Sequence, residues 1–127
     1  MKENGPNGYS SVIRQELMAA VGLVLKKVGT GYEGRGWPDL YVPSPIWHGW
    51  IELKVEGREV SDAQQRKMRL LLERQVPAVV LRWTASEGER IERWNGELLA
   101  RRVVSESKAV RGRDLLVQLA GICENWW

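Results

Sequence analysis

Three residues in the first half of the chain have types and spacing that suit a metal-assisted reaction. Asp39 follows Pro38, and after 12 intervening residues come Glu52, Leu53 and Lys54. Residues two apart in a strand project to the same face, so Glu52 and Lys54 should point together while Leu53 points into the core. A charged pair on an otherwise apolar strand is costly unless a bound ion or a polar pocket compensates it.

The chemistry of these side chains favours a divalent cation. Asp39 and Glu52 supply carboxylate oxygens, which Mg²⁺ prefers as ligands, and the backbone carbonyl of Leu53 can add a further oxygen. Lys54 beside the ion can position or deprotonate a water and stabilise charge that builds on a phosphate. A His-rich zinc site is excluded because His48 is the single histidine. We expect Mg²⁺, with Mn²⁺ able to substitute, and no organic cofactor.

The first element that must position these residues is a helix. Residues 1–9 are polar and rich in Gly and Pro, which is typical of a flexible arm. Apolar residues then recur at helical spacing, and Ser10 or Ser11 is a suitable N-cap. This pattern predicts a helix that continues to Val28 and ends at Gly29.

The rest of the chain alternates between strand and helix patterns. The expected elements are a short strand over 39–42, a strand over 50–55, a helix opened by Ser61 and closed by Pro77, a strand over 78–83, a hairpin over 90–100 with its turn at Asn95-Gly96, and a short helix over 113–127. This order predicts an α/β fold, with a mixed sheet flanked by helices in a single domain over 10–127.

Composition and charge set wider limits. A chain of 127 residues suits one domain. The 19 basic and 16 acidic residues give a net charge of +3, which permits a polyanionic partner without requiring one. The single cysteine, Cys123, excludes an intrachain disulfide and fits a reducing compartment. No apolar run approaches the roughly 20 residues that span a membrane, so we expect a cytoplasmic protein with no membrane partner.

The motif residues resemble the PD-(D/E)xK nuclease signature, and their surroundings resemble its VRR-NUC branch, which is related to Holliday junction resolvases. That branch has a glutamate on the first helix, a Gly-x-Pro-Asp turn, Glu-x-Lys and a Ser-x-x-Gln helix. This chain has Glu16, 36–39, 52–54 and 61–64 in the same order. The resemblance covers about 10–83 and implies a restriction-endonuclease-like fold with an αβββαβ core. The C-terminal hairpin and helix lie outside it.

The alternative interpretation of Asp39 is an ordinary turn residue, and that of Glu52 and Lys54 is the solvated face of an edge strand. Two further residues of the motif also have alternative interpretations. Glu16 either joins the metal site, directly or through water, or pairs with a neighbour such as Arg14 or Lys26. Gln64 either faces the catalytic pocket, as the resemblance implies, or completes a capping box with Ser61. Both alternatives stay open at the level of the sequence.

Basic and aromatic residues near the motif are candidates for substrate contacts. Arg35 and Lys67 are the preferred phosphate contacts, although a solvated charged face is the default interpretation of such residues. Trp37 lies inside the Gly-x-Pro-Asp turn and either packs or stacks on substrate. Trp126 and Trp127 are expected to dock on the core or at a subunit interface.

The resemblance and the residues together predict a metal-dependent DNA endonuclease that hydrolyses phosphodiester bonds by direct attack of water. So small a chain has little surface for sequence readout, which favours branched, flapped or junction DNA as substrate. A homodimer that cuts opposing strands, in a bacterial cell or a phage-infected host, follows by fold-level analogy. The alternatives are a non-catalytic DNA-binding module on the same fold, an RNA-directed nuclease, and a structural subunit that binds protein.

Overall fold

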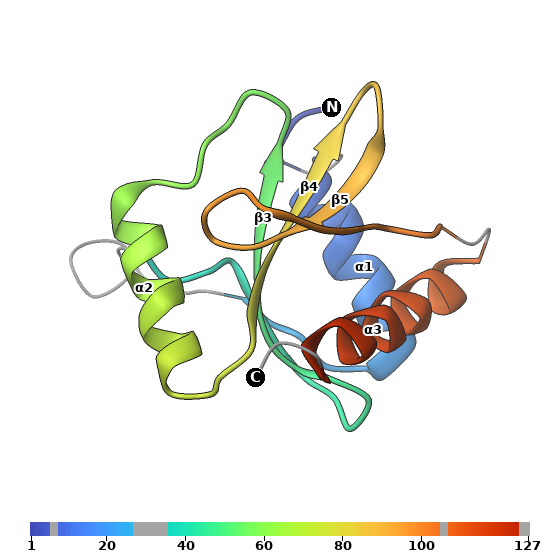
Figure 1. Cartoon of the computed structure of the whole chain (residues 1–127). Helices are drawn as coiled ribbons and strands as arrows, with labels where there is room; N and C mark the ends of the chain where they lie inside the picture. The colour runs from blue at the N-terminus through green and yellow to red at the C-terminus, as the bar shows by residue number, and fades with distance from the viewer. Residues whose placement is uncertain (6–7, 27–35, 105–106, 125–127) are drawn as a thin grey trace.

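The computed structural model describes residues 1–5, 8–26, 36–104 and 107–124 (Figure 1). Within these ranges the chain forms a mixed six-stranded sheet and three helices, which confirms the predicted α/β class. In chain order the elements are α1 (Tyr9–Val21), β1 (Leu25–Lys26), β2 (Leu40–Pro43), β3 (His48–Val55), α2 (Asp62–Glu73), β4 (Ala78–Thr84), β5 (Gly88–Glu92), β6 (Leu98–Arg101) and α3 (Lys108–Glu124). None of the helices in the described part of the chain is both long and apolar enough to cross a bilayer.

The strands lie in the sheet in the order of the sequence, from β1 to β6. All neighbours are antiparallel except β3 and β4, which are parallel. Parallel neighbours need a long crossover connection, and α2 supplies it. Figure 1 shows α2 on one side of the sheet and α1 with α3 on the other.

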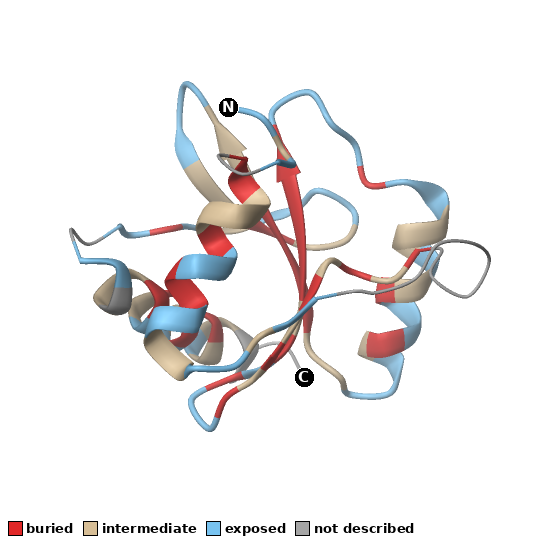
Figure 2. Cartoon of the chain, turned by 180° about the vertical axis from the view of Figure 1, so that it is seen from behind, coloured by how far each residue is buried: buried red, intermediate tan, exposed pale blue. Residues whose placement is uncertain are grey.

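The central strands bury both of their faces. Ile51 and Leu53 of β3 belong to the core that packs against α1 and α3, whereas Ala78 and Val80 of β4 belong to a second, smaller core that packs against α2. Figure 2 shows the buried residues concentrated along these strands and on the inner faces of the helices. The sheet between two helical layers therefore holds β3, which carries the candidate site, in a fixed position.

The first helix is shorter than predicted. It ends at Val21 because Gly22 adopts a left-handed conformation, with φ of 77°, and donates its N–H to the carbonyl of Met18. Leu25 and Lys26 then form strand β1, so the prediction that the helix continues through them was wrong. A glycine C-cap stopped the helix although the apolar spacing continued.

The N-terminal arm contributes to the start of α1. The N–H of Tyr9 donates to the carbonyl of Lys2 at 2.7 Å, and the N–H of Ser10 donates to the carbonyl of Glu3 at 3.0 Å. Gly8 occupies the N-cap position in place of the predicted serines. Backbone carbonyls of the arm therefore satisfy donors that a serine cap would otherwise satisfy.

The later elements follow the prediction with two differences. The β5–β6 hairpin is present, but residues 93–97 connect its strands instead of a two-residue Asn-Gly turn. The last helix begins at Lys108 rather than Arg113 and is the longest of the three described helices, with 17 residues. It crosses α1 closely at Gly112, where a Cβ atom would overlap the carbonyl oxygen of Glu16.

Candidate active site

Strand β3 places Glu52 and Lys54 on the face of the sheet that α2 covers. Glu52 aligns with Val80, which packs in the core beneath α2, whereas Leu53 aligns with Leu81 in the opposite core. The predicted alternation along this strand is confirmed. Glu52 is 1% exposed and Lys54 is 9% exposed. A carboxylate and an ammonium so far removed from water require compensating partners or a ligand.

Asp39 lies immediately before β2 and is held against β3. Leu40 pairs with Ile51, and continuing this register by one residue places Asp39 beside Glu52. The Oδ2 atom of Asp39 accepts a hydrogen bond from the backbone N–H of Leu53 at 2.8 Å. The carboxylate is therefore fixed against the segment that joins Glu52 to Lys54, whereas the side chains of Asp39 and Lys54 line different pockets.

The turn that carries Asp39 packs against the start of α2. Gly36 has a φ of 82°, and a Cβ atom at this position would lie 2.5 Å from the carbonyl oxygen of Ala63. A side chain at Gly36 would therefore be both strained and obstructed. The Gly-Trp-Pro-Asp turn and the Ser-x-x-Gln helix, which are distant in sequence, are neighbours in the fold.

Three half-buried aromatic residues form a row beside this turn. The ring of Trp50 lies 5.3 Å from that of Trp37 and 5.2 Å from that of Tyr41. The Nζ atom of Lys67 lies 4.6 Å from the centre of the Trp37 ring, a cation–π contact. The packing role of Trp37 is confirmed, and a phosphate contact by Lys67 stays a prediction.

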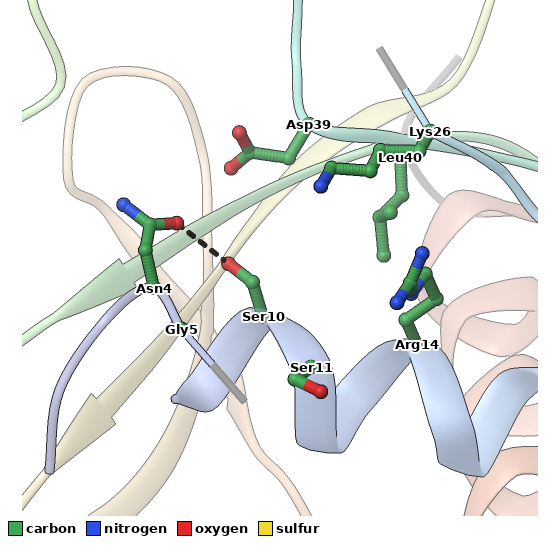
Figure 3. A pocket seen from close by; sticks show the side chains of 8 residues that line it. All are labelled: Asn4, Gly5, Ser10, Ser11, Arg14, Lys26, Asp39 and Leu40. Atoms are coloured by element: carbon green, nitrogen blue, oxygen red, sulfur yellow. Dashed lines mark hydrogen bonds between the residues drawn. The ribbon is translucent and has the colours of Figure 1, made fainter. Parts of the chain in front are cut away.

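Two pockets adjoin the trio. Asp39 lines a pocket of about 420 Å³ together with Arg14, Lys26 and the serines at the start of α1 (Figure 3). Lys54 lines a second pocket, of about 400 Å³, together with Arg58 and two acidic residues, Glu3 and Glu59. Asn4 of the N-terminal arm lines both pockets. The pocket beside Asp39 thus adds positive charge, whereas the basic and acidic residues that line the pocket beside Lys54 balance one another.

The donor set at the trio fits the expected ion. No cluster of three or more His, Cys, Asp or Glu side chains suited to a metal occurs in the described residues. The site consists instead of two carboxylates, that of Asp39 immediately before β2 and that of Glu52 on β3. Mg²⁺ typically takes one or two carboxylates and completes its shell with waters and substrate phosphates, whereas structural zinc requires four protein ligands. A ligand role for the carbonyl of Leu53 stays a prediction.

Comparisons of this chain with protein-family models, with curated proteins and with solved structures gave no significant match. Nuclease chemistry is accordingly a proposal that depends on the residues themselves and on how the strands and helices place them.

Glu16 lies in a different environment from the trio. Its buried carboxylate accepts a hydrogen bond from Arg102 at 2.6 Å and lies 3.6 Å from Arg111. Glu16 therefore has ion-pair partners, but they are not the neighbours Arg14 and Lys26 that the sequence suggested. The real partners come from the segment after β6 and from α3, which lie beyond the motif.

Arg102 organises a buried ionic cluster around Glu16. It also donates to both carboxylate oxygens of Glu89, at 2.9 and 3.0 Å, and Glu89 accepts a hydrogen bond from the Tyr9 hydroxyl at 2.5 Å. Burial acts to lower the pKa of Arg102, but the carboxylates of Glu89 and Glu16 outweigh it and raise that pKa. Burial and the charge of Glu89 also raise the pKa of Tyr9. The cluster holds Arg102 charged and Tyr9 neutral.

Gln64 takes part in the capping box at the start of α2. Its Oε1 atom accepts from the backbone N–H of Ser61 at 2.9 Å, and its own N–H donates to the Ser61 hydroxyl at 3.2 Å. The capping interpretation is confirmed, and contact with a substrate stays a prediction. Arg35, Trp126 and Trp127 lie outside the described residues.

The pocket beside Asp39 adds residues whose part in the site the sequence did not indicate. Arg14 and Lys26 had been considered only as partners of Glu16, yet both line this pocket with Asp39. A helical signal for Arg14 was present, because Ser10 and Ser11 precede it by four and three residues and so share its face. Lys26 carried no comparable signal, since its strand is only two residues long.

Proposed function

We propose that this chain is a metal-dependent DNA endonuclease whose active site consists of Asp39, Glu52 and Lys54. The observation that carries the proposal is the hydrogen bond from Leu53 to Asp39, which ties the first acid to the middle of the Glu-Leu-Lys segment. If Asp39 were only a turn residue, and Glu52 and Lys54 only the solvated face of a strand, this contact would not be needed. The burial of Glu52 and Lys54 and the basic residues of the pocket beside Asp39 also support a site that binds a charged substrate.

The arrangement of elements supports the same proposal. One helix, three antiparallel strands, a crossover helix and a parallel strand follow one another from α1 to β4. This is the αβββαβ order that resemblance to the PD-(D/E)xK nucleases implies. The fold alone would not specify a reaction, so the chemistry depends on the trio.

Each residue has a distinct part in the proposed hydrolysis. Asp39 and Glu52 would hold Mg²⁺, which when bound supplies positive charge to a phosphate and lowers the pKa of water. Lys54 orients the attacking water and donates to a phosphate oxygen. Arg14 and Lys26 add positive charge for the phosphate in the pocket beside Asp39. The water oxygen forms a bond to phosphorus, the bond to the leaving oxygen breaks, and the leaving oxygen takes up a proton.

The proposed substrate is DNA with a branch, a flap or a junction. The row of Trp37, Trp50 and Tyr41 lies next to the turn that carries Asp39, and aromatic side chains stack on unpaired bases irrespective of sequence. A homodimer would present two such sites to opposing strands. Light scattering would measure the mass in solution, which should be that of two chains if the protein is a homodimer.

A cleavage assay on a panel of substrates tests the proposal. Labelled junction, flapped, single-stranded and duplex DNA, with matched RNA, would be incubated with the protein in Mg²⁺, Mn²⁺ or EDTA. We expect cleavage of the branched DNA that requires metal, is lost in Asp39→Asn and is kept in Arg113→Gln, a change at an exposed residue of α3. Binding without cleavage in every metal would contradict the proposal in favour of a DNA-binding module, and preferential cleavage of RNA would identify an RNA-directed nuclease.

A further inference from the structure

Basic residues of four neighbouring strands align in one row across the sheet. Lys54 of β3 pairs with Arg82 of β4, Arg82 pairs with Arg90 of β5, and Arg90 pairs with Arg101 of β6. Residues aligned across neighbouring strands project to the same face. The row therefore begins at the candidate catalytic lysine and continues on its face of the sheet.

The row becomes more exposed with distance from the active site. Lys54 is 9% exposed, and the exposed fractions of the side chains of Arg82, Arg90 and Arg101 are 16%, 24% and 62%. The core beneath α2 includes Val80 of β4 and is packed by Trp94 of the β5–β6 connection, but none of the arginines in the row belongs to it. The outer arginines can therefore be reached from solvent.

Two carboxylates compensate part of the charge in the row. Glu92 pairs with Arg82 at 3.0 Å and with Arg90 at 2.9 Å, and Glu87 pairs with Arg90 at 3.1 Å and with Arg101 at 3.2 Å. Like charges directly opposite one another are destabilising, so such partners are needed to align the arginines. The three arginines and two carboxylates leave a net positive charge, and each guanidinium has five N–H donors. Arg82 also donates to the backbone carbonyls of Val55 and Arg58, so the contribution of the row to a phosphate comes chiefly from Arg90 and Arg101.

The outer end of the row already stabilises an exposed anion. Hydrogen bonding and charge from Arg101, together with the charge of Arg90, lower the pKa of the Glu87 carboxyl group. A phosphodiester presents the same kind of acceptor, a negatively charged pair of oxygens, to the same donors. Glu87 therefore occupies a position for which a phosphate would compete.

We propose that Arg82, Arg90 and Arg101, which we call the arginine row, form a track for the phosphates of nucleic acid held at the active site. This inference rests on the proposed nuclease function and identifies a role for the β5–β6 hairpin, which the motif does not explain. Four strands about 4.8 Å apart span roughly 14 Å, the length of about four phosphates along one strand of a duplex.

Two substitutions that change the charge of the arginine row in opposite directions test its role. Binding of labelled duplex DNA would be measured by fluorescence anisotropy in EDTA over a range of NaCl concentrations. Arg101→Gln should weaken binding several-fold and make the slope of log K against log salt shallower by about 0.9. Glu87→Gln should strengthen binding several-fold because it removes the competing carboxylate. Arg101→Lys should retain most of the affinity, and Arg113→Gln on α3 is the matched control.

The sign of the Glu87→Gln effect separates the track from a folding defect. Weaker binding by Glu87→Gln, or equal effects of Arg101→Gln and Arg113→Gln, would overturn the inference. Cleavage assays in Mg²⁺ distinguish a failure of the phosphate track from a failure of the proposed nuclease function. If the wild type cuts DNA and Arg101→Gln changes neither affinity nor KM, the track is wrong and the nuclease stands. If both substitutions shift binding as expected but no DNA is cut, the proposed nuclease function is wrong and the phosphate track stands. If the wild type does not bind DNA, both proposals are overturned.

Discussion

Asp39 and Glu16 are acids of the same sequence motif that the fold places in different surroundings. Asp39 accepts a backbone N–H and lines a pocket, so one side of its carboxylate remains directed toward possible ligands. Glu16 is 3% exposed and interacts with two arginines. At the scale of single residues, these surroundings fit the role in chemistry that we propose for Asp39, and they give Glu16 a role in stability.

Replacement of Glu16 by Gln tests this division. The change leaves the buried guanidinium of Arg102 without one of its two carboxylates. Breaking a buried pair by removing one partner typically costs about 3–5 kcal/mol, and we expect a loss in that range in the free energy of unfolding. Urea denaturation followed by circular dichroism would measure it. Unchanged stability with loss of cleavage would instead place Glu16 in the chemistry.

At the scale of elements, the sequence correctly predicts those features of helices and strands that depend on the local spacing of apolar residues. The alternation along β3 correctly predicts that Glu52 and Lys54 share a face. The end of α1 is not predictable from spacing, because Gly22 stops the helix while apolar residues continue at helical intervals. The arginine row depends on the register of β4, β5 and β6, which no local pattern specifies.

The turn at Gly36 packs the segment that carries Asp39 against the start of α2. Gly36→Ala would combine a positive φ with overlap against the carbonyl of Ala63. We expect loss of more than about 2 kcal/mol of stability, since strain and backbone obstruction add, together with loss of cleavage. The matched control is Gly96→Ala, which has a φ of 89° but no atom within 4 Å of the added Cβ. Equal thermal stabilities for the two variants would contradict the proposed packing.

At the scale of the whole molecule, the ionic cluster joins α1 to β5 and to the segment that follows β6. Tyr9 and Glu16 of α1 meet Glu89 of β5 and Arg102, which follows β6. The sequence did not predict these pairs because Arg102 and Glu16 lie 86 residues apart. The region beyond the motif therefore completes the core on which α1 packs.

The cluster predicts a specific dependence of stability on pH. The pKa of Tyr9 in the folded chain lies above its ordinary value of 10.0, so the unfolded chain loses this proton first as pH rises. The contribution of Tyr9 is complete below pH 10 and declines as pH rises toward the folded-state pKa. Relative to Tyr9→Phe, the wild type should be more stable by about 1–3 kcal/mol at pH 8, and this advantage should shrink above pH 10.

Urea unfolding of both proteins from pH 8 to about pH 11 would measure that difference, since lysine and arginine titrations common to both chains cancel. A constant advantage across this range would show that Tyr9 does not hold its proton more tightly in the folded state.

Cleavage of junction DNA by Lys54→Ala tests the central claim most directly. Lys54 is the buried basic group nearest to the proposed chemistry, and Lys108→Ala, at an exposed lysine of α3, is the matched control. With circular dichroism confirming that both variants fold, single-turnover rates in Mg²⁺ would be compared with the wild type. We expect a loss of at least about 100-fold for Lys54→Ala, the scale of removing one transition-state donor, and no change for Lys108→Ala. A folded Lys54→Ala that cuts at the wild-type rate would contradict the proposed active site.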